Sequence, residues 1–231
     1  MTTHFITSSG TGIGKTLVTA ALAWQLRKFG QSVCAIKPVI SGFTPENGTE
    51  SDSGILLAAL GEKVTNDAIK LITPWRYSAP LAPDLAASRE GRTLNFAEVV
   101  EFCREAAESA NRDGAMLLIE GVGGVMAPIT SEQTVADWMS VLDIRAILVV
   151  GSYLGAISHS LTAVEALAAQ SIPIAAVVVS ESEASTVTLD DTVETLSRFL
   201  PEKRLLVLPR IRQTTEPWRA APDLTSALDE K

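Results

Sequence analysis

Short apolar runs alternate along the chain with longer segments whose apolar residues recur at helical spacing. The runs are apolar on successive residues, which is typical of strands covered on both faces of a parallel sheet. Alternation of the two patterns predicts parallel strands joined by crossover helices. The predicted strands cover residues 4–7, 33–36, 115–119, 146–150, 174–179 and 205–208, and the predicted helices cover residues 15–29, 53–60, 96–110, 158–170 and 186–199.

These elements predict a single α/β domain over residues 1–231, a parallel sheet with helices on both faces. Two segments interrupt the pattern. Residues 40–51 are rich in Ser, Gly, Thr and Asn, and residues 73–93 contain three prolines, so both are predicted to be irregular and functional. Residues 213–231 are polar and are predicted to form a partly loose tail.

Composition narrows the function classes. The chain has 46% hydrophobic and 20% charged residues and a net charge of −8, so it is predicted to be globular and not to bind nucleic acid. It begins without a secretory signal and has no apolar run of about 18 residues, which predicts a soluble cytoplasmic protein outside the membrane. Cys34 and Cys103 lack metal-type spacing and are expected to be reduced core thiols.

Ligands of an open parallel sheet bind beyond the carboxyl ends of the strands, so the residues that follow each predicted strand define the candidate site. Most of these segments are polar or rich in glycine. They are residues 8–14, Lys37, residues 120–124, residues 151–152, residues 180–181 and Pro209.

The segment GTGIGKT at residues 10–16 lies between a predicted strand and a predicted helix. Glycines let backbone N–H groups surround phosphate oxygens, a lysine such as Lys15 neutralises the β- and γ-phosphates, and a hydroxyl such as that of Thr16 ligates Mg²⁺. The strict pattern has glycine where this chain has Ser9. A glycine-rich turn with a chance Gly-Lys-Thr is the alternative. The context favours a nucleoside triphosphate site and a fold of the P-loop NTPase type.

Three further charged residues are candidates for the site, two at predicted strand ends and one before a predicted helix. Lys37 is placed to reach a γ-phosphate from the side opposite Lys15, and a solvated lysine is the alternative. Asp52 precedes a short helix, where an N-cap role is equally open. Glu120 follows an apolar strand and precedes glycines, which predicts a metal ligand at the phosphates, with helix capping as the alternative.

The residues Gly155, Ala156, Ile157 and Ser158 lead into a predicted helix. The backbone N–H groups at a helix N-terminus suit a carboxylate, so these residues are a candidate anion site. His159, in the first turn, is expected to be structural.

With these residues in view, the chain resembles the dethiobiotin synthetase family of biotin biosynthesis over residues 4–216. The shared motifs follow one another in the expected order and spacing. They are GIGKT at residues 12–16, KPVISG at 37–42, SD at 51–52, PLAP at 80–83, EGVGG at 120–124, ADW at 136–138 and LGAISH at 154–159.

The resemblance implies a homodimer that closes a cyclic urea. ATP, CO₂ or bicarbonate, and 7,8-diaminononanoate would give dethiobiotin, ADP and phosphate. One amine captures CO₂ as a carbamate, which attacks the γ-phosphate, and the second amine attacks the resulting carbamic–phosphoric anhydride and expels phosphate. Transfer of a phosphoryl group with this much negative charge needs cations and Mg²⁺.

The resemblance also implies residue roles. The catalytic residues would be Lys37, Lys15, Thr11 and Ser41, with Lys37 at the carbamate and the γ-phosphate, and Thr11 and Ser41 at the diamine or carbamate. Thr16, Asp52 and Glu120 would hold Mg²⁺. The substrate carboxylate would bind near Gly155, Ala156, Ile157 and Ser158 across the dimer interface. The nucleotide would contact Gly12, Ile13, Gly14, Lys15, Thr16, Leu17, Asp52, Glu120, Gly121, Val122, Gly123, Ser180, Glu181, Pro209, Arg210, Ile211 and Glu216.

The chain departs from the family pattern in three places. The phosphate loop usually begins Gly-Thr-Asp-Thr, and residues 8–11 read SSGT. The Asn that reads adenine is Ser180, whose hydroxyl cannot match a paired amide donor and acceptor, which predicts loose selection among ATP, CTP, GTP and UTP. Ser158 replaces the usual Asn before the helix histidine, which predicts a looser grip on the carboxylate.

Two other ATPase classes fit part of the pattern. A partition or division switch ATPase carries a lysine five positions before the loop lysine, where this chain has Gly10, and uses a basic or amphipathic tail. An amide-forming synthetase of the cobyrinate type needs a further glutaminase domain, which is not expected within 231 residues.

Overall fold

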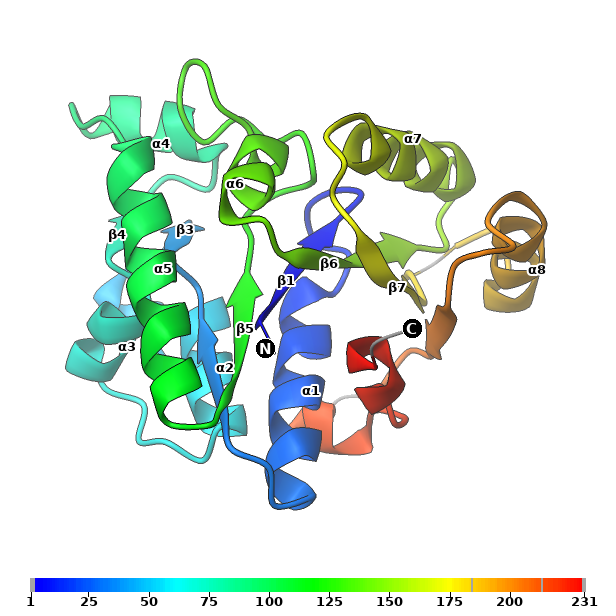
Figure 1. Ribbon diagram of the computed structural model, residues 1–231, viewed down its shortest axis with the longest axis horizontal. Coiled ribbons are helices and arrows are strands. Elements are labelled where there is room, and N and C mark those ends of the chain that lie inside the picture. The colour runs from blue at the N-terminus through cyan, green and yellow to red at the C-terminus, as the bar shows by residue number, and fades with distance from the viewer. Residues whose placement is uncertain (1–2, 184, 213, 230–231) are drawn as a thin grey trace.

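Six parallel strands form the central sheet of the computed structural model, which describes residues 3–183, 185–212 and 214–229 (Figure 1). Their order is β2-β5-β1-β6-β7-β8. The bounds are β1 Thr3–Ser8, β2 Val33–Ile36, β5 Met116–Glu120, β6 Arg145–Gly151, β7 Ile174–Ser180 and β8 Leu205–Leu208. All six predicted strands and the α/β fold class are therefore confirmed.

Helices cover both faces of this sheet because successive strand residues point into two different cores. Phe5 packs edge-on against Trp138, with ring centroids 4.9 Å apart, whereas its neighbour Ile6 packs beside α1. The first face carries α5 (Phe96–Arg112), α6 (Val135–Leu142), α7 (Ala156–Ala169) and α8 (Leu189–Phe199), and the second carries α1 (Lys15–Lys28) and α2 (Asp52–Ala59). Burial on both faces explains why the strands are continuously apolar.

The two segments predicted to be irregular contain short regular elements, so that prediction was wrong in part. They include β3 (Val39–Ser41), the 3₁₀ turn Pro45–Asn47, β4 (Trp75–Tyr77) and α4 (Pro83–Arg89). β3 and β4 pair in parallel as a separate two-stranded sheet. Strands of three residues are too short to show a pattern, and Pro83 begins a helix because its first turn needs no N–H donor.

The sequence pattern also missed α3 (Asn66–Ile72) and α6. Both are short helices whose first turns are capped by threonine. Thr65 accepts a hydrogen bond from the Ala68 N–H, and Thr134 accepts one from the Asp137 N–H. Helix α8 begins at Leu189, because Thr188 caps it, rather than at the predicted residue 186. α7 begins at Ala156, two residues before its predicted start.

The C-terminal segment packs on α1 rather than lying free of the domain. Its 3₁₀ turns Pro217–Ala220 and Thr225–Leu228 bury Trp218 and Leu228. Gln25 of α1 donates to the Pro222 carbonyl at 2.7 Å and accepts from the Leu224 N–H at 2.9 Å. A loose tail is therefore not observed over residues 214–229, and Gln213, Glu230 and Lys231 lie outside the described residues.

Both cysteines are free thiols, but only one lies in the core. Cys103 is buried in α5. Cys34 is exposed, contrary to prediction, because β2 is the edge strand of the sheet. No helix within the described ranges is long and apolar enough to span a membrane.

Candidate active site

The loop between β1 and α1 turns sharply at two glycines. Gly12 and Gly14 have φ angles of 72° and 105°, a region that L side chains rarely adopt. Gly14 is also the N-cap of α1, so Lys15 and Thr16 form its first turn. The free backbone N–H groups at the N-terminus of α1 therefore lie at this loop, where they could bind an anion such as phosphate.

Two cavities adjoin this loop, and Gly12, Ile13 and Gly14 line both. The larger has a volume of about 720 Å³ and the smaller about 260 Å³. Of the predicted site residues, the larger cavity is also lined by Thr11, Lys15, Thr16, Lys37, Ser41, Asp52, Val122 and Gly123. The smaller is also lined by Leu17, Ser180, Glu181, Pro209, Arg210 and Ile211. The phosphate loop thus forms a wall between two distinct compartments.

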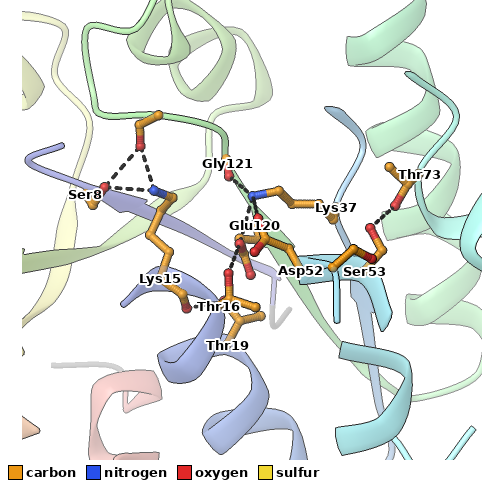
Figure 2. Close-up of polar contacts among 12 residues, drawn as sticks. Ser8, Lys15, Thr16, Thr19, Lys37, Asp52, Ser53, Thr73, Glu120 and Gly121 are labelled. Atoms are coloured by element: carbon orange, nitrogen blue, oxygen red, sulfur yellow. Dashed lines mark hydrogen bonds and ion pairs between the residues drawn. The ribbon is translucent and has the colours of Figure 1, made fainter. Parts of the chain in front are cut away.

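A buried lysine joins two acidic residues that are distant in the sequence (Figure 2). The Lys37 ammonium is 2.8 Å from Glu120 Oε1 and 3.0 Å from Asp52 Oδ2, and it donates to the Gly121 carbonyl at 2.7 Å. Burial alone would lower the pKa of Lys37, but the charges of Glu120 and Asp52 outweigh it and raise that pKa. Lys37 is only 2% exposed, so it is not a solvated lysine at a strand end.

Asp52 is not the N-cap of α2, because Ser51 has that role. The Ser51 hydroxyl accepts a hydrogen bond from the Gly54 N–H at 3.2 Å. Asp52 occupies the first helical position and directs its carboxylate to Lys37. Burial favours the neutral acid, but Lys37 outweighs it and lowers the pKa of Asp52. Asp52 is therefore an ionised carboxylate that pairs with Lys37 and lines the larger cavity.

Glu120 lies at the end of β5 and is fully buried. Its Oε1 accepts from the Thr16 hydroxyl at 2.8 Å and from Lys37, whereas its Oε2 is buried without a hydrogen-bond partner among the described residues. A buried carboxylate oxygen without a partner is costly unless a ligand satisfies it. Glu120 caps no helix, because α6 begins fifteen residues later at Val135 and is capped by Thr134.

The two carboxylates and the Thr16 hydroxyl suit a hard cation. Mg²⁺ takes oxygen ligands and usually keeps several waters or phosphate oxygens among them. No group of three His, Cys, Asp or Glu side chains that could hold a metal occurs in the described parts of the chain. The oxygens of Thr16, Asp52 and Glu120 are of the type that Mg²⁺ accepts as ligands.

Lys15 is the second buried lysine of the larger cavity. Its ammonium donates to the Ser8 hydroxyl at 3.0 Å and to the Gly123 carbonyl at 2.7 Å. Burial and the nearby charge of Lys37 lower the pKa of Lys15 to about 8. Two lysines therefore line one cavity, Lys15 from the first turn of α1 and Lys37 from just beyond the end of β2, which concentrates positive charge where phosphates would bind.

The smaller cavity contains two ion-paired or hydrogen-bonded acidic residues. Glu181 accepts a hydrogen bond from the Arg210 N–H at 2.7 Å, and Glu183 pairs with the Arg210 guanidinium at 2.9 Å. Ser180 lies against the phosphate loop, since a Cβ on Gly14 would be 2.8 Å from its hydroxyl oxygen. Glu216 lies outside the described lining of both cavities and pairs with Arg219 instead.

The N-terminus of α7 is also separate from both cavities as far as the described residues define them. Gly155 is its N-cap with a φ of 94°, and Ser158 is exposed. His159 bonds to the Tyr153 hydroxyl at 2.8 Å, which agrees with its expected structural role. Leu154, just before the helix, is 77% exposed.

Several lining residues were absent from the predicted set. In the larger cavity they are Ile40, Pro80, Leu81, Ala82, Pro83 and Ala127, and in the smaller Ser182, Glu183 and Pro217. Ser182 and Glu183 follow β7 directly, so their position at a strand end was a usable signal. Residues 80–83 (PLAP) are one of the motifs shared with the family. Their side chains are apolar, so nothing in the sequence identified them individually as residues of the site.

Known proteins are similar to this chain in sequence or in fold. A family described as an AAA domain matches residues 2–218. The ATP-dependent dethiobiotin synthetase BioD of Methylobacterium nodulans is 47% identical over 210 residues, 90% of this chain and 93% of that protein. The protein of the same name from Acidiphilium cryptum is 47% identical over 201 residues, 87% of this chain and 89% of that protein. The MinC:MinD cell division complex of Aquifex aeolicus has a TM-score of 0.56 at 18% identity, covering 95% of this chain and 86% of that chain, which shows a shared fold alone.

Proposed function

This chain belongs to the dethiobiotin synthetase family, and on that premise we propose which of its residues carry out the reaction. It is an ATP-dependent ligase that forms dethiobiotin in biotin biosynthesis. The observation that supports the larger cavity as its active site is the convergence of Lys15 and Lys37 beside a phosphate loop. A cytoplasmic location is part of the same proposal.

The proposed reaction uses 7,8-diaminononanoate and CO₂ in the larger cavity. One amine adds to CO₂ and loses a proton to give a carbamate, whose oxygen attacks the γ-phosphorus as the bond to ADP breaks. The second amine then attacks the carbonyl carbon, phosphate leaves and a proton is lost. Lys37 would stabilise the carbamate and the transferred phosphoryl group, Lys15 the β- and γ-phosphates, and Thr11 and Ser41 would orient the diamine. Apolar lining from Leu81 and Pro83 suits its hydrocarbon chain.

Assay of the purified chain with and without the diamine tests this function. We expect ADP release in the presence of bicarbonate to require 7,8-diaminononanoate and to match dethiobiotin formed. ADP release that is independent of the diamine would instead indicate a switch ATPase. The similarity to MinD concerns the fold alone and is not evidence for that alternative function.

Mg²⁺ would be held by Thr16, Asp52 and Glu120 and would neutralise charge on the phosphates. The orphaned Glu120 Oε2 supports this assignment. We expect Asp52→Asn and Glu120→Gln each to raise the Mg²⁺ concentration for half-maximal rate by about tenfold or more, since each removes a charged ligand. The measurement is the rate as a function of Mg²⁺ at fixed ATP.

Asp190→Asn is the matched control for the metal prediction. Asp190, like Asp52, lies in the first turn of a helix, but it belongs to α8 and is exposed. Its substitution should leave the Mg²⁺ requirement unchanged. An unchanged requirement in Asp52→Asn as well would remove Asp52 from the proposed metal site.

The pKa of Lys15 predicts a pH dependence. A lysine whose pKa is about 8 loses its positive charge as the pH rises through that value. Because kcat/KM reports ionisation of the free enzyme, we expect kcat/KM for ATP to fall above about pH 8. A value that stays constant between about pH 7 and 9.5 would contradict the combination of a Lys15 pKa of about 8 and a need for its positive charge in ATP binding.

The smaller cavity would hold the nucleotide base, next to Ser180, Glu181 and Arg210. Ser180 offers a hydroxyl where a paired amide donor and acceptor would read adenine. Sites without such matched polar groups discriminate by about 1–3 kcal/mol, so we expect CTP, GTP and UTP to support turnover within about a hundredfold of ATP.

Comparison of kcat/KM for the four triphosphates in the unmodified protein and in Ser180→Asn tests this selectivity. The substitution should sharpen the preference for ATP without changing the KM for the diamine. Strong preference for ATP in both proteins would show that other groups, most simply backbone amides, read adenine. Ser197→Asn, at an exposed position of α8, is a control for the substitution itself.

The proposed assembly is a homodimer. At the N-terminus of α7, Leu154, Gly155 and Ser158 are exposed, whereas Ile157 is partly buried and Ala156 is buried, and none of them lines the chain's own cavities as described. In a dimer it would supply backbone N–H groups to the substrate carboxylate at the partner's cavity. The exposed apolar side chain of Leu154 supports burial of this surface against a second copy.

A further inference from the structure

The side chain of Ser8 is buried behind the phosphate loop and contacts three polar groups. Ser8 ends β1 and is 0% exposed. Its hydroxyl oxygen accepts from the Lys15 ammonium at 3.0 Å and lies within hydrogen-bond distance of the carbonyls of Gly10 and Gly123. A hydroxyl has one proton to donate and two lone pairs, so it can accept from Lys15 while donating to one carbonyl.

These contacts determine the direction of the Lys15 ammonium (Figure 2). An ammonium group has three N–H donors. Ser8 and the Gly123 carbonyl, at 2.7 Å, take two of them, and the described residues provide no third acceptor within hydrogen-bond distance. Because Lys15 lines the larger cavity, its remaining N–H is available to a ligand there.

Ser8 also lies where the two glycine-rich loops of the site meet. Its carbonyl accepts from the Val125 N–H at 2.9 Å. A Cβ on Gly124 would be 3.1 Å from the Gly10 nitrogen and 3.2 Å from the Ser8 oxygen, so the loop after β5 contacts the phosphate loop directly. The hydroxyl therefore connects Gly10 of one loop, Gly123 of the other and the lysine between them.

We propose that Ser8 is a positioning residue, which holds Lys15 against the Gly123 carbonyl so that the third N–H meets the triphosphate. This proposal rests on the assignment of Lys15 to the phosphates in the proposed function. In this role Ser8 would affect nucleotide binding only by orienting Lys15. Ser8 itself would contact neither the nucleotide nor the diamine.

A double-mutant cycle measured by nucleotide binding tests the proposal. Affinity for ATP with Mg²⁺ would be measured calorimetrically, without diamine, for the unmodified protein, Ser8→Ala, Lys15→Met and the double variant. We expect Ser8→Ala to weaken binding about 10- to 150-fold when Lys15 is present, the range for a hydrogen bond to a charged group. In the Lys15→Met background the same change should alter the affinity by less than about twofold, because residues that act through one another are not additive.

Equal weakening in both backgrounds would overturn the proposal, because Ser8 would then act independently of Lys15. Ser8→Cys, which keeps the side-chain size but accepts hydrogen bonds weakly, should behave as Ser8→Ala and guards against misfolding of one variant. Thr192→Val removes another fully buried hydroxyl, in α8, and should leave the affinity unchanged. The binding measurements contain no diamine, so their result does not depend on dethiobiotin synthesis. Failure of the proposed function would be seen separately, in the synthesis assay of the unmodified protein.

Discussion

Lys37→Met is expected to lower kcat by at least about a hundredfold to a thousandfold, the range seen when a group that stabilises transition-state charge is lost. Lys37 is the cation that the proposed mechanism places at both the carbamate and the transferred phosphoryl group. Methionine preserves most of the side-chain volume, so the change removes charge with little loss of packing. Single-turnover formation of dethiobiotin is the measurement that isolates this step.

The same substitution should change the free protein. Without the ammonium, the fully buried carboxylate of Glu120 and the partly exposed carboxylate of Asp52 would lie near each other with no ammonium between them. Removal of one partner from a buried ion pair costs about 3–5 kcal/mol. We therefore expect a lower Tm for Lys37→Met, and a larger rise in Tm on addition of Mg²⁺ alone than in the unmodified protein.

Lys63→Met, at an exposed lysine beyond α2, is the control and should change neither kcat nor the response to Mg²⁺. Near-normal kcat in Lys37→Met would exclude Lys37 from the chemistry. An unaltered Tm with an unaltered response to Mg²⁺ would show that the carboxylates find another partner in the free protein.

Lys15→Ala is expected to abolish measurable turnover and to weaken triphosphate binding while the fold remains intact. The loss of one charge at the β- and γ-phosphates affects both the bound nucleotide and the transition state. Thr16→Val should also abolish turnover, because it removes the hydroxyl proposed for Mg²⁺. Dethiobiotin formation and calorimetric binding of ATP are the two measurements.

Matched variants on the same helix control these two changes. Lys28→Ala, at the other end of α1, should retain full activity, since Lys28 is exposed, lines neither cavity and has its ammonium over the Trp24 ring, 5.0 Å from the centroid. Thr16→Ser keeps the hydroxyl and should restore most of the activity lost in Thr16→Val. Near-normal turnover in Lys15→Ala would refute the phosphate-loop assignment.

Strand positions could be predicted from the sequence because the strands are buried on both faces. β6 and β7 contain long apolar runs, as expected for strands that are covered on both faces. β1 is equally buried but has only Phe5 and Ile6 as apolar residues, and its position before the glycine-rich loop is the clearer signal. The short elements around the larger cavity, β3, β4 and α4, were not predicted. Their three to seven residues owe their structure to packing against the main sheet, a contribution that no local pattern records.

Site residues were predictable where a motif or a position directly after a strand marked them. Lys15 and Thr16 belong to the phosphate-loop motif, and Glu120 lies at the end of an apolar strand. The pairing of Lys37 with Asp52 was not predictable from spacing, because it depends on Ser51 taking the N-cap role and so leaving Asp52 to face the cavity. The part played by Ser8 was missed because a small polar residue at a strand end has no distinctive sequence signal.

The position of Gly12, Ile13 and Gly14 between the two cavities has a consequence for inhibitor design. On the proposed assignment, a molecule in the smaller cavity would compete with ATP alone, and one that fills only the diamine region of the larger cavity would compete with the diamine alone. A bisubstrate compound would need a linker that runs from one cavity to the other past the backbone of residues 12–14. A short anionic linker could take the place of the triphosphate there. Binding of one end would raise the effective concentration of the other end at its own cavity. The linked compound should therefore bind more tightly than either half, even if each half alone binds weakly.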